Sequence, residues 1–173
     1  MFRLTATALA LSTAMIGTAF AGGQFVDKTG FAVSGHDVVS YFELAQSKAG
    51  APQTAPAEGR ATITADYNGA TFAFATTANR DRFVADPAAF APQYDGHCAY
   101  GVAQGGKVPG NPNLWRIVDG KLFLNINKTV VGFWEADIPG NLKAANRNWA
   151  SIEPEPASQA KIPNFSSKAP VTN

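Results

Sequence analysis

The chain has 173 residues, with 14 Lys and Arg, 13 Asp and Glu, 46% hydrophobic residues and a formal net charge of +1. This length and balance predict one globular domain, and the near-zero charge excludes the basic surface expected of a nucleic-acid-binding protein. One cysteine, Cys98, excludes an internal disulfide framework and any zinc site that needs two thiolates, and 16 Gly with 11 Pro indicate many turns and short elements.

The first predicted element is an export signal over residues 1–21. Arg3 supplies a positive charge, residues 4–21 carry none, and the stretch ends in Ala19-Phe20-Ala21, a pattern of small residues that signal peptidase accepts. A membrane anchor is the alternative, but Ala and Thr make the stretch only weakly apolar. We therefore expect cleavage after Ala21, a periplasmic or secreted location, and no membrane attachment of the mature chain.

The body, residues 22–152, is expected to contain two hairpins. Strands over 61–67 and 71–75 flank Asn68-Gly69, and strands over 114–118 and 121–125 flank Asp119-Gly120. Both dipeptides favour the tight turns of antiparallel hairpins. The two hairpins share this turn type but no residue pattern, so no internal repeat is visible.

Apolar spacing predicts short helices around these hairpins, over 37–44, 77–85, 98–104, 130–134 and 138–149. The predicted fold class is therefore α+β: a small antiparallel sheet built from the two hairpins, with several short helices packed against it. Residues 153–173 contain four Pro among Ser, Lys and Ala, and are expected to form a disordered tail.

The residues with the clearest chemical potential are Cys98 and its neighbour His97, which lie in a break between predicted helices. A thiolate beside an imidazole suits Cu(I), Zn or Fe, so both are candidate metal ligands, together with His36 if the fold brings it near. The alternative is that Cys98 packs in the core as a small apolar residue and that the histidines are simply hydrogen-bonded. No phosphate-binding loop, zinc-protease motif or nucleophile elbow occurs.

Six blocks of sequence, in order, resemble the exported YHS-domain proteins of bacteria: Gly35–Phe42, Tyr67–Phe74, Asn79–Phe83, Asp86–Phe90, Pro92–Ala99 and Asp119–Asn125. The resemblance runs from about residue 31 to about residue 150. YHS domains also occur in copper-transporting ATPases and near phenol hydroxylases, which implies transition-metal handling. Cysteine-bearing members place thiols beside the Phe-rich strand and in the next helix, where this chain has Ala75 and Asn79, so their metal site does not carry over.

These observations lead to the expectation of a monomeric, periplasmic, non-enzymatic binding protein for a transition metal such as copper, with Cys98, His97 and His36 as metal ligands. One alternative is a cysteine-dependent enzyme, with Cys98 as nucleophile, His36 or His97 as base, and Asp37 or Asp95 as the orienting carboxylate. A thiol pKa at or above its ordinary value would argue against it. The other alternative is an interaction module without metal, with an unidentified periplasmic protein as partner.

Overall fold

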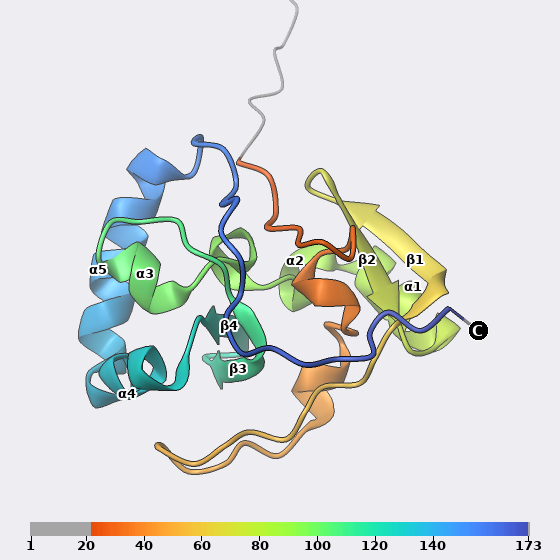
Figure 1. The fold of residues 1–173 in the computed structure, drawn as a ribbon, viewed down its shortest axis with the longest axis horizontal. Helices are drawn as coiled ribbons and strands as arrows, with labels where there is room; N and C mark the ends of the chain where they lie inside the picture. Colours follow the sequence, from red (N-terminus) through yellow and green to blue (C-terminus); the bar gives the residue numbers. More distant parts are fainter. Residues whose placement is uncertain (1–21, 173) are drawn as a thin grey trace, which may run out of the picture.

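The computed structural model describes residues 22–172. The predicted signal peptide, residues 1–21, lies outside the described residues, and none of the helices described is long and apolar enough to cross a membrane. The predicted α+β class is confirmed: two antiparallel hairpins lie among several short helices (Figure 1). The hairpins form two separate two-stranded sheets and do not pair with each other.

The first hairpin consists of β1 (Arg60–Tyr67) and β2 (Ala70–Phe74). Asn68 and Gly69 both have positive φ angles, 46° and 75°, as the predicted tight turn requires. Helices α1 (Thr77–Ala85) and α2 (Pro87–Phe90) follow. The Thr76 side chain accepts a hydrogen bond from the N–H of Asn79, which caps the start of α1.

The second hairpin consists of β3 (Asn111–Val118) and β4 (Lys121–Asn125), and it is followed by α4 (Lys128–Ala136) and α5 (Ile138–Ile152). The short helix α3 (Ala99–Ala103) precedes this hairpin and packs against α5 (Figure 1). The 37–44 prediction corresponds to a shorter 3₁₀ turn, η2 (Ser40–Glu43).

The two halves of the body repeat the same backbone plan. β1 begins at residue 60 and β3 at residue 111, 51 residues later, and in both hairpins the register shifts between the first residue and the fourth residue after it. Helices α1 and α4 each have nine residues, and Asp86 and Asp137 cap the helices that follow with closely similar φ and ψ angles. Phe83 in α1 and Trp134 in α4 occupy matching positions and are fully buried. The structure therefore contains an internal repeat that the residue pattern does not reveal.

The core falls into two clusters, and the first of them joins the first hairpin to Trp115, Leu122 and Leu124 of the second. In the first, the Phe83 ring lies 4.8 Å from the Phe72 ring and 5.1 Å from the Phe74 ring, measured between centroids. In the second, the Phe123 ring lies 5.6 Å from the Trp134 ring. These buried aromatic rings pack each helix against its hairpin.

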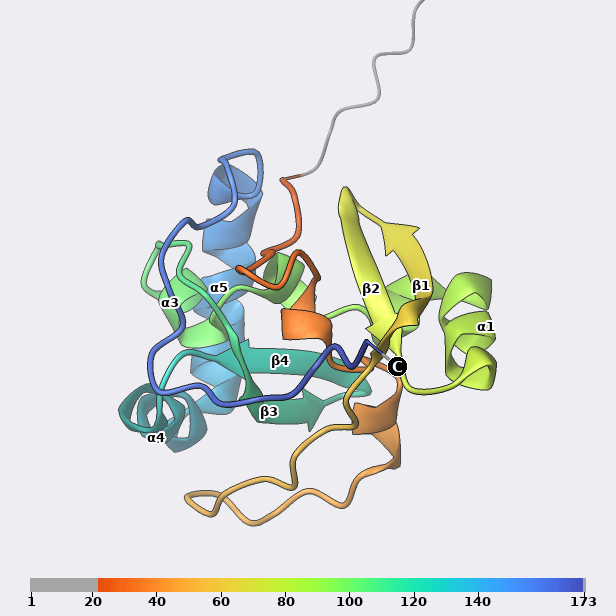
Figure 2. The same ribbon diagram turned by 45° about the vertical axis from the view of Figure 1, so that its right-hand side comes forward.

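Residues 153–172 follow a defined course across the body, where the sequence predicts disorder (Figures 1 and 2). Near its end the segment pairs with the start of β1: the Val171 N–H donates to the Gly59 carbonyl at 2.8 Å, and the Ala61 N–H donates to the Val171 carbonyl at 2.8 Å. Main-chain pairing of this kind does not need the apolar periodicity on which sequence reasoning depends.

Candidate functional site

Two of the predicted site residues lie in equivalent loops. Turn η1 (Val33–Gly35) precedes His36, and turn η3 (Gln93–Gly96) precedes His97. The three residues before each histidine have positive φ angles: 50°, 52° and 77° in the first loop, and 55°, 52° and 76° in the second. Two non-glycine residues per loop are thus left-handed, at a cost of about 1–2 kcal/mol each. The same strained conformation is built twice, and each time it presents a histidine.

Each histidine ring is held by the carbonyl three residues earlier. The Nδ1 atom of His36 lies 3.2 Å from the Val33 carbonyl oxygen, and Nδ1 of His97 lies 2.9 Å from the Tyr94 carbonyl oxygen. Because a carbonyl only accepts hydrogen bonds, Nδ1 carries the hydrogen in both rings. The Nε2 atom is therefore the free acceptor of each neutral imidazole.

Both Nε2 atoms face the C-terminal tail. The Ser158 N–H donates to Nε2 of His97 at 3.1 Å, and the Ser167 hydroxyl lies 3.0 Å from Nε2 of His36. Burial lowers the pKa of His97 from 6.5 to about 4, and burial also lowers the pKa of His36. Both rings are therefore neutral near pH 7 and serve as acceptors for the tail.

Cys98 lies inside the core and not at the surface. Its side chain is fully buried, the Sγ–H donates to Oδ1 of Asn125 at 3.4 Å, and Sγ accepts from the Gly101 N–H at 3.4 Å. Burial raises the pKa of the Cys98 thiol. A buried thiol with a raised pKa is a poor nucleophile, which argues against the cysteine-dependent enzyme.

The position of Cys98 in the second loop is taken by Asp37 in the first. The Asp37 carboxylate is fully buried and accepts from the N–H groups of Val39 and Ala75, both at 2.9 Å, and from Nδ2 of Asn79 at 2.7 Å. Ala75, directly after β2, and Asn79, in α1, thus both donate hydrogen bonds to this buried carboxylate.

The predicted ligands do not meet in one metal centre. Within residues 22–172, no group of three or more His, Cys, Asp or Glu side chains could hold a metal ion. His97 and Cys98 are adjacent in sequence, but the imidazole contacts Ser158 of the tail while the thiol contacts Asn125 of β4. The donor set of Cys98, His97 and His36 therefore does not fit a shared copper ion in this structure.

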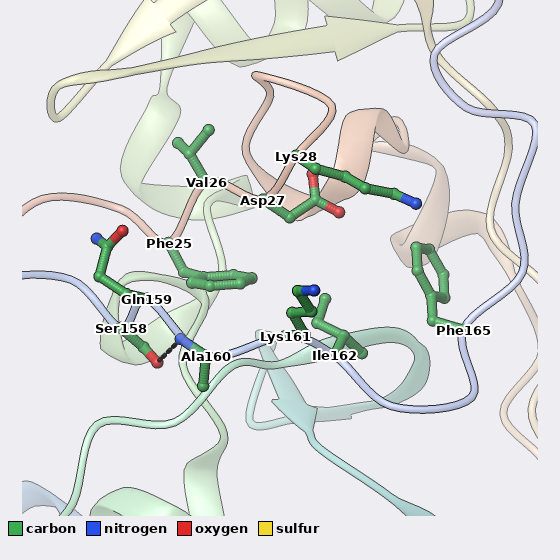
Figure 3. Close-up of a pocket in the computed structure, with 10 residues that line it drawn as sticks. All are labelled: Phe25, Val26, Asp27, Lys28, Ser158, Gln159, Ala160, Lys161, Ile162 and Phe165. Atoms are coloured by element: carbon green, nitrogen blue, oxygen red, sulfur yellow. Dashed lines mark hydrogen bonds between the residues drawn. The ribbon is translucent and has the colours of Figure 1, made fainter.

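A cleft of about 440 Å³ lies between the N-terminal segment and the tail, and Figure 3 shows the side chains that line it. Phe25, on one wall, packs its ring 5.9 Å from the His97 ring. Phe165, on the other, packs its ring 5.7 Å from the His36 ring. The cleft thus connects the surroundings of the two histidines along the tail.

Sequence reasoning missed the contacts that the tail makes and a buried polar cluster around Asp95. Asp95 accepts hydrogen bonds from Gln24, 71 residues away, and from Asn68 of the first turn. Nothing in local spacing signals such a contact, although Asp95 stands directly before the Gly96-His97 pair that was singled out.

Comparison with known proteins adds no relative: no family model, no curated protein and no solved structure matches the chain.

Proposed function

We propose that this chain is an exported, non-enzymatic binding protein that holds an extended polypeptide segment on the surface now covered by its own tail. We call this surface the tail track; it comprises His97, His36, Glu58 and the main chain of Gly59–Ala61, where β1 begins. The observation that carries the proposal is that the tail is held at each of these points by a hydrogen bond.

The tail track recognises mainly the main chain. Three of the donors that the tail offers are backbone N–H groups: Ser158 to His97, Lys168 to the Glu58 carboxylate, and Val171 to the Gly59 carbonyl. Addition of an extended segment to a strand edge is a general mode of peptide binding, in which main-chain hydrogen bonds supply affinity. A different segment with the same backbone path could make the same bonds.

The tail also buries little of its own surface. Among residues 153–172, only Ala169 is buried, at 8% exposure. Apolar burial is the main source of tight attachment. Because Ile162, Phe165 and Val171 of the tail are only half-buried, we expect the segment to be exchangeable. A partner in the cell envelope with an extended, Ser- and Pro-containing segment fits this surface.

Copper is a second candidate ligand, supported by one observation. An imidazole whose Nδ1–H is held by a carbonyl, with Nε2 unprotonated, has the orientation that metal-ligating histidines use. His36 and His97 both have it. Because tail donors occupy both Nε2 atoms, copper binding at these rings would require the tail to leave.

The test uses the folded mature chain with a protease site inserted after the exposed Pro156. After cleavage, a fluorescent peptide spanning 157–173 should exchange into the track, as measured by anisotropy. The same peptide with Val171→Pro lacks one N–H donor and should bind about tenfold more weakly, whereas Val171→Ala keeps the donor and serves as control. Equal binding of all three peptides, or no exchange at all into a body that stays folded, would refute the proposal.

A further inference from the structure

A polar cluster around Asp95 contains two buried oxygens that lack a donor. Oδ1 of Asp95 accepts from Nε2 of Gln24 at 3.0 Å and from Nδ2 of Asn68 at 2.8 Å. Oδ2 of Asp95 and Oε1 of Gln24 have no hydrogen-bond partner among residues 22–172. Asp95 is 9% exposed and Gln24 is 5% exposed, so water does not readily satisfy them.

Two charged groups act on this cluster. Burial raises the pKa of Asp95 to about 6, the positive charge of Lys107 lowers it, and the negative charge of Glu153 raises it by a smaller amount. The Lys107 ammonium donates to the Glu153 and Glu155 carbonyl oxygens at 2.9 and 2.7 Å, and not to Asp95. The missing group is therefore a hydrogen-bond donor, and a positively charged one suits a buried carboxylate best.

Gly22 passes through the same cluster. The Asn68 amide that donates to Asp95 also donates to the Gly22 carbonyl, at 3.3 Å. Gly22 is buried, and a Cβ at this position would collide with the Glu153 carbonyl oxygen and with the Lys107 ammonium, which the Glu153 and Glu155 carbonyl oxygens hold. A pocket of about 370 Å³ next to it is lined by Gln24, Asn68, Asp95 and Glu153.

We propose that removal of the export signal completes this cluster with the new N-terminus. Hydrolysis of the Ala21–Gly22 bond consumes one water and leaves a carboxylate on Ala21 and an α-ammonium group on Gly22. That ammonium donates to Oδ2 of Asp95 and Oε1 of Gln24. The precursor has an uncharged peptide N–H in place of the ammonium, so the mature chain gains a buried ion pair that the precursor cannot form.

The inference rests on cleavage after Ala21 and is independent of the tail track. Its test compares the mature chain beginning at Gly22 with the same chain acetylated on the Gly22 nitrogen, which removes the charge without a substitution. Carboxyl NMR should place the Asp95 pKa about one unit or more lower in the free form, because an opposite charge within a few ångströms favours the carboxylate. The melting temperature at pH 7 should be higher for the free form.

Two substitutions locate the effect. Asp95→Asn should abolish the difference in melting temperature between free and acetylated chains. Asp119→Asn, in the turn between β3 and β4, makes the same chemical change and should preserve the difference; Asp119 and Asp95 have φ angles of 50° and 52°, which Asn tolerates.

Identical Asp95 pKa values in the free and acetylated chains would overturn the inference. The α-ammonium would then lie too far from Asp95 to form the ion pair. Mass spectrometry of protein exported by the native host is the second check, and a mature chain that begins at any residue other than Gly22 would overturn it too.

Discussion

Replacement of His97 by Gln should change how the stability of the protein depends on pH. The His97 ring is fully buried, Nδ1 donates to the Tyr94 carbonyl, and Nε2 accepts from the Ser158 N–H. Protonation would place a hydrogen on Nε2 that points at another donor. The folded state therefore favours the neutral ring, which is consistent with the lowering of the His97 pKa from 6.5 to about 4.

The sign and size of the effect follow from this shift. A histidine whose pKa is lower in the folded state contributes stability that is fully present above pH 6.5, declines as the pH falls, and is lost through pH 4. With 1.36 kcal/mol per pKa unit, the loss between these limits is about 3 kcal/mol. Asp95 acts in the opposite direction, because burial raises its pKa to about 6, so acidification from pH 6 towards 4 stabilises the fold through that group.

Urea unfolding followed by tryptophan fluorescence, at pH 7.5 and pH 4, measures the effect. The difference between wild type and His97→Gln isolates His97, because Asp95 titrates in both proteins. Gln retains an oxygen acceptor for the Ser158 N–H, so the variant should fold. The stability of wild type relative to the variant should fall by about 3 kcal/mol from pH 7.5 to 4. Parallel profiles for the two proteins would show that the buried ring does not control acid stability.

Three further predictions concern the buried groups beside the two loops. Cys98 is the N-cap of α3, and serine is a preferred residue at such positions. Cys98→Ser should therefore change the free energy of unfolding by no more than about 1 kcal/mol, because a hydroxyl can replace both thiol hydrogen bonds, whereas Cys98→Ala should cost about 1–2 kcal/mol. The reverse order in urea titrations would contradict the contacts assigned to the thiol. Asp37→Ala should lower the free energy of unfolding, measured in the same urea titrations, by about 3 kcal/mol or more, because three N–H donors lose their acceptor. A loss below about 1 kcal/mol would mean that these donors find other partners. In a Cu(I) competition titration of the intact protein, Cys98→Ala should leave the affinity unchanged because the thiol faces Asn125, and a large loss would identify it as a ligand.

The fold class could be predicted because its signals are local. Asn68-Gly69 and Asp119-Gly120 fix two tight turns, and alternating residues on either side fix the strands. The repeat could not be predicted, because the halves share backbone angles, caps and buried positions while the side chains differ, as Phe83 and Trp134 do. The course of the tail could not be predicted either, since main-chain pairing leaves no pattern in the residues.

The candidate site was predicted in its residues but not in its arrangement. His36, His97 and Cys98 were identified by chemical type, and sequence alone could not say which way each side chain faces. The structure turns the imidazoles towards the tail and the thiol towards Asn125. The cluster at Asp95 was missed because its contacts join segments far apart in the chain, and only the fold brings them together.

The repeat makes Asp37 and Cys98 directly comparable, since one loop holds a carboxylate at the position where the other holds a thiol. Both residues directly follow the histidine of a left-handed turn and precede a short helical segment, but their partners differ in kind. Asp37 meets three donors, which only a strong acceptor can satisfy. Cys98 meets one acceptor, Oδ1 of Asn125, and one donor, the Gly101 N–H, and a thiol can satisfy both where a carboxylate would repel the oxygen. The two halves thus keep one backbone path, and residue types recur at the histidines and at the caps Asp86 and Asp137. Asp37 and Cys98 differ because their hydrogen-bond partners differ.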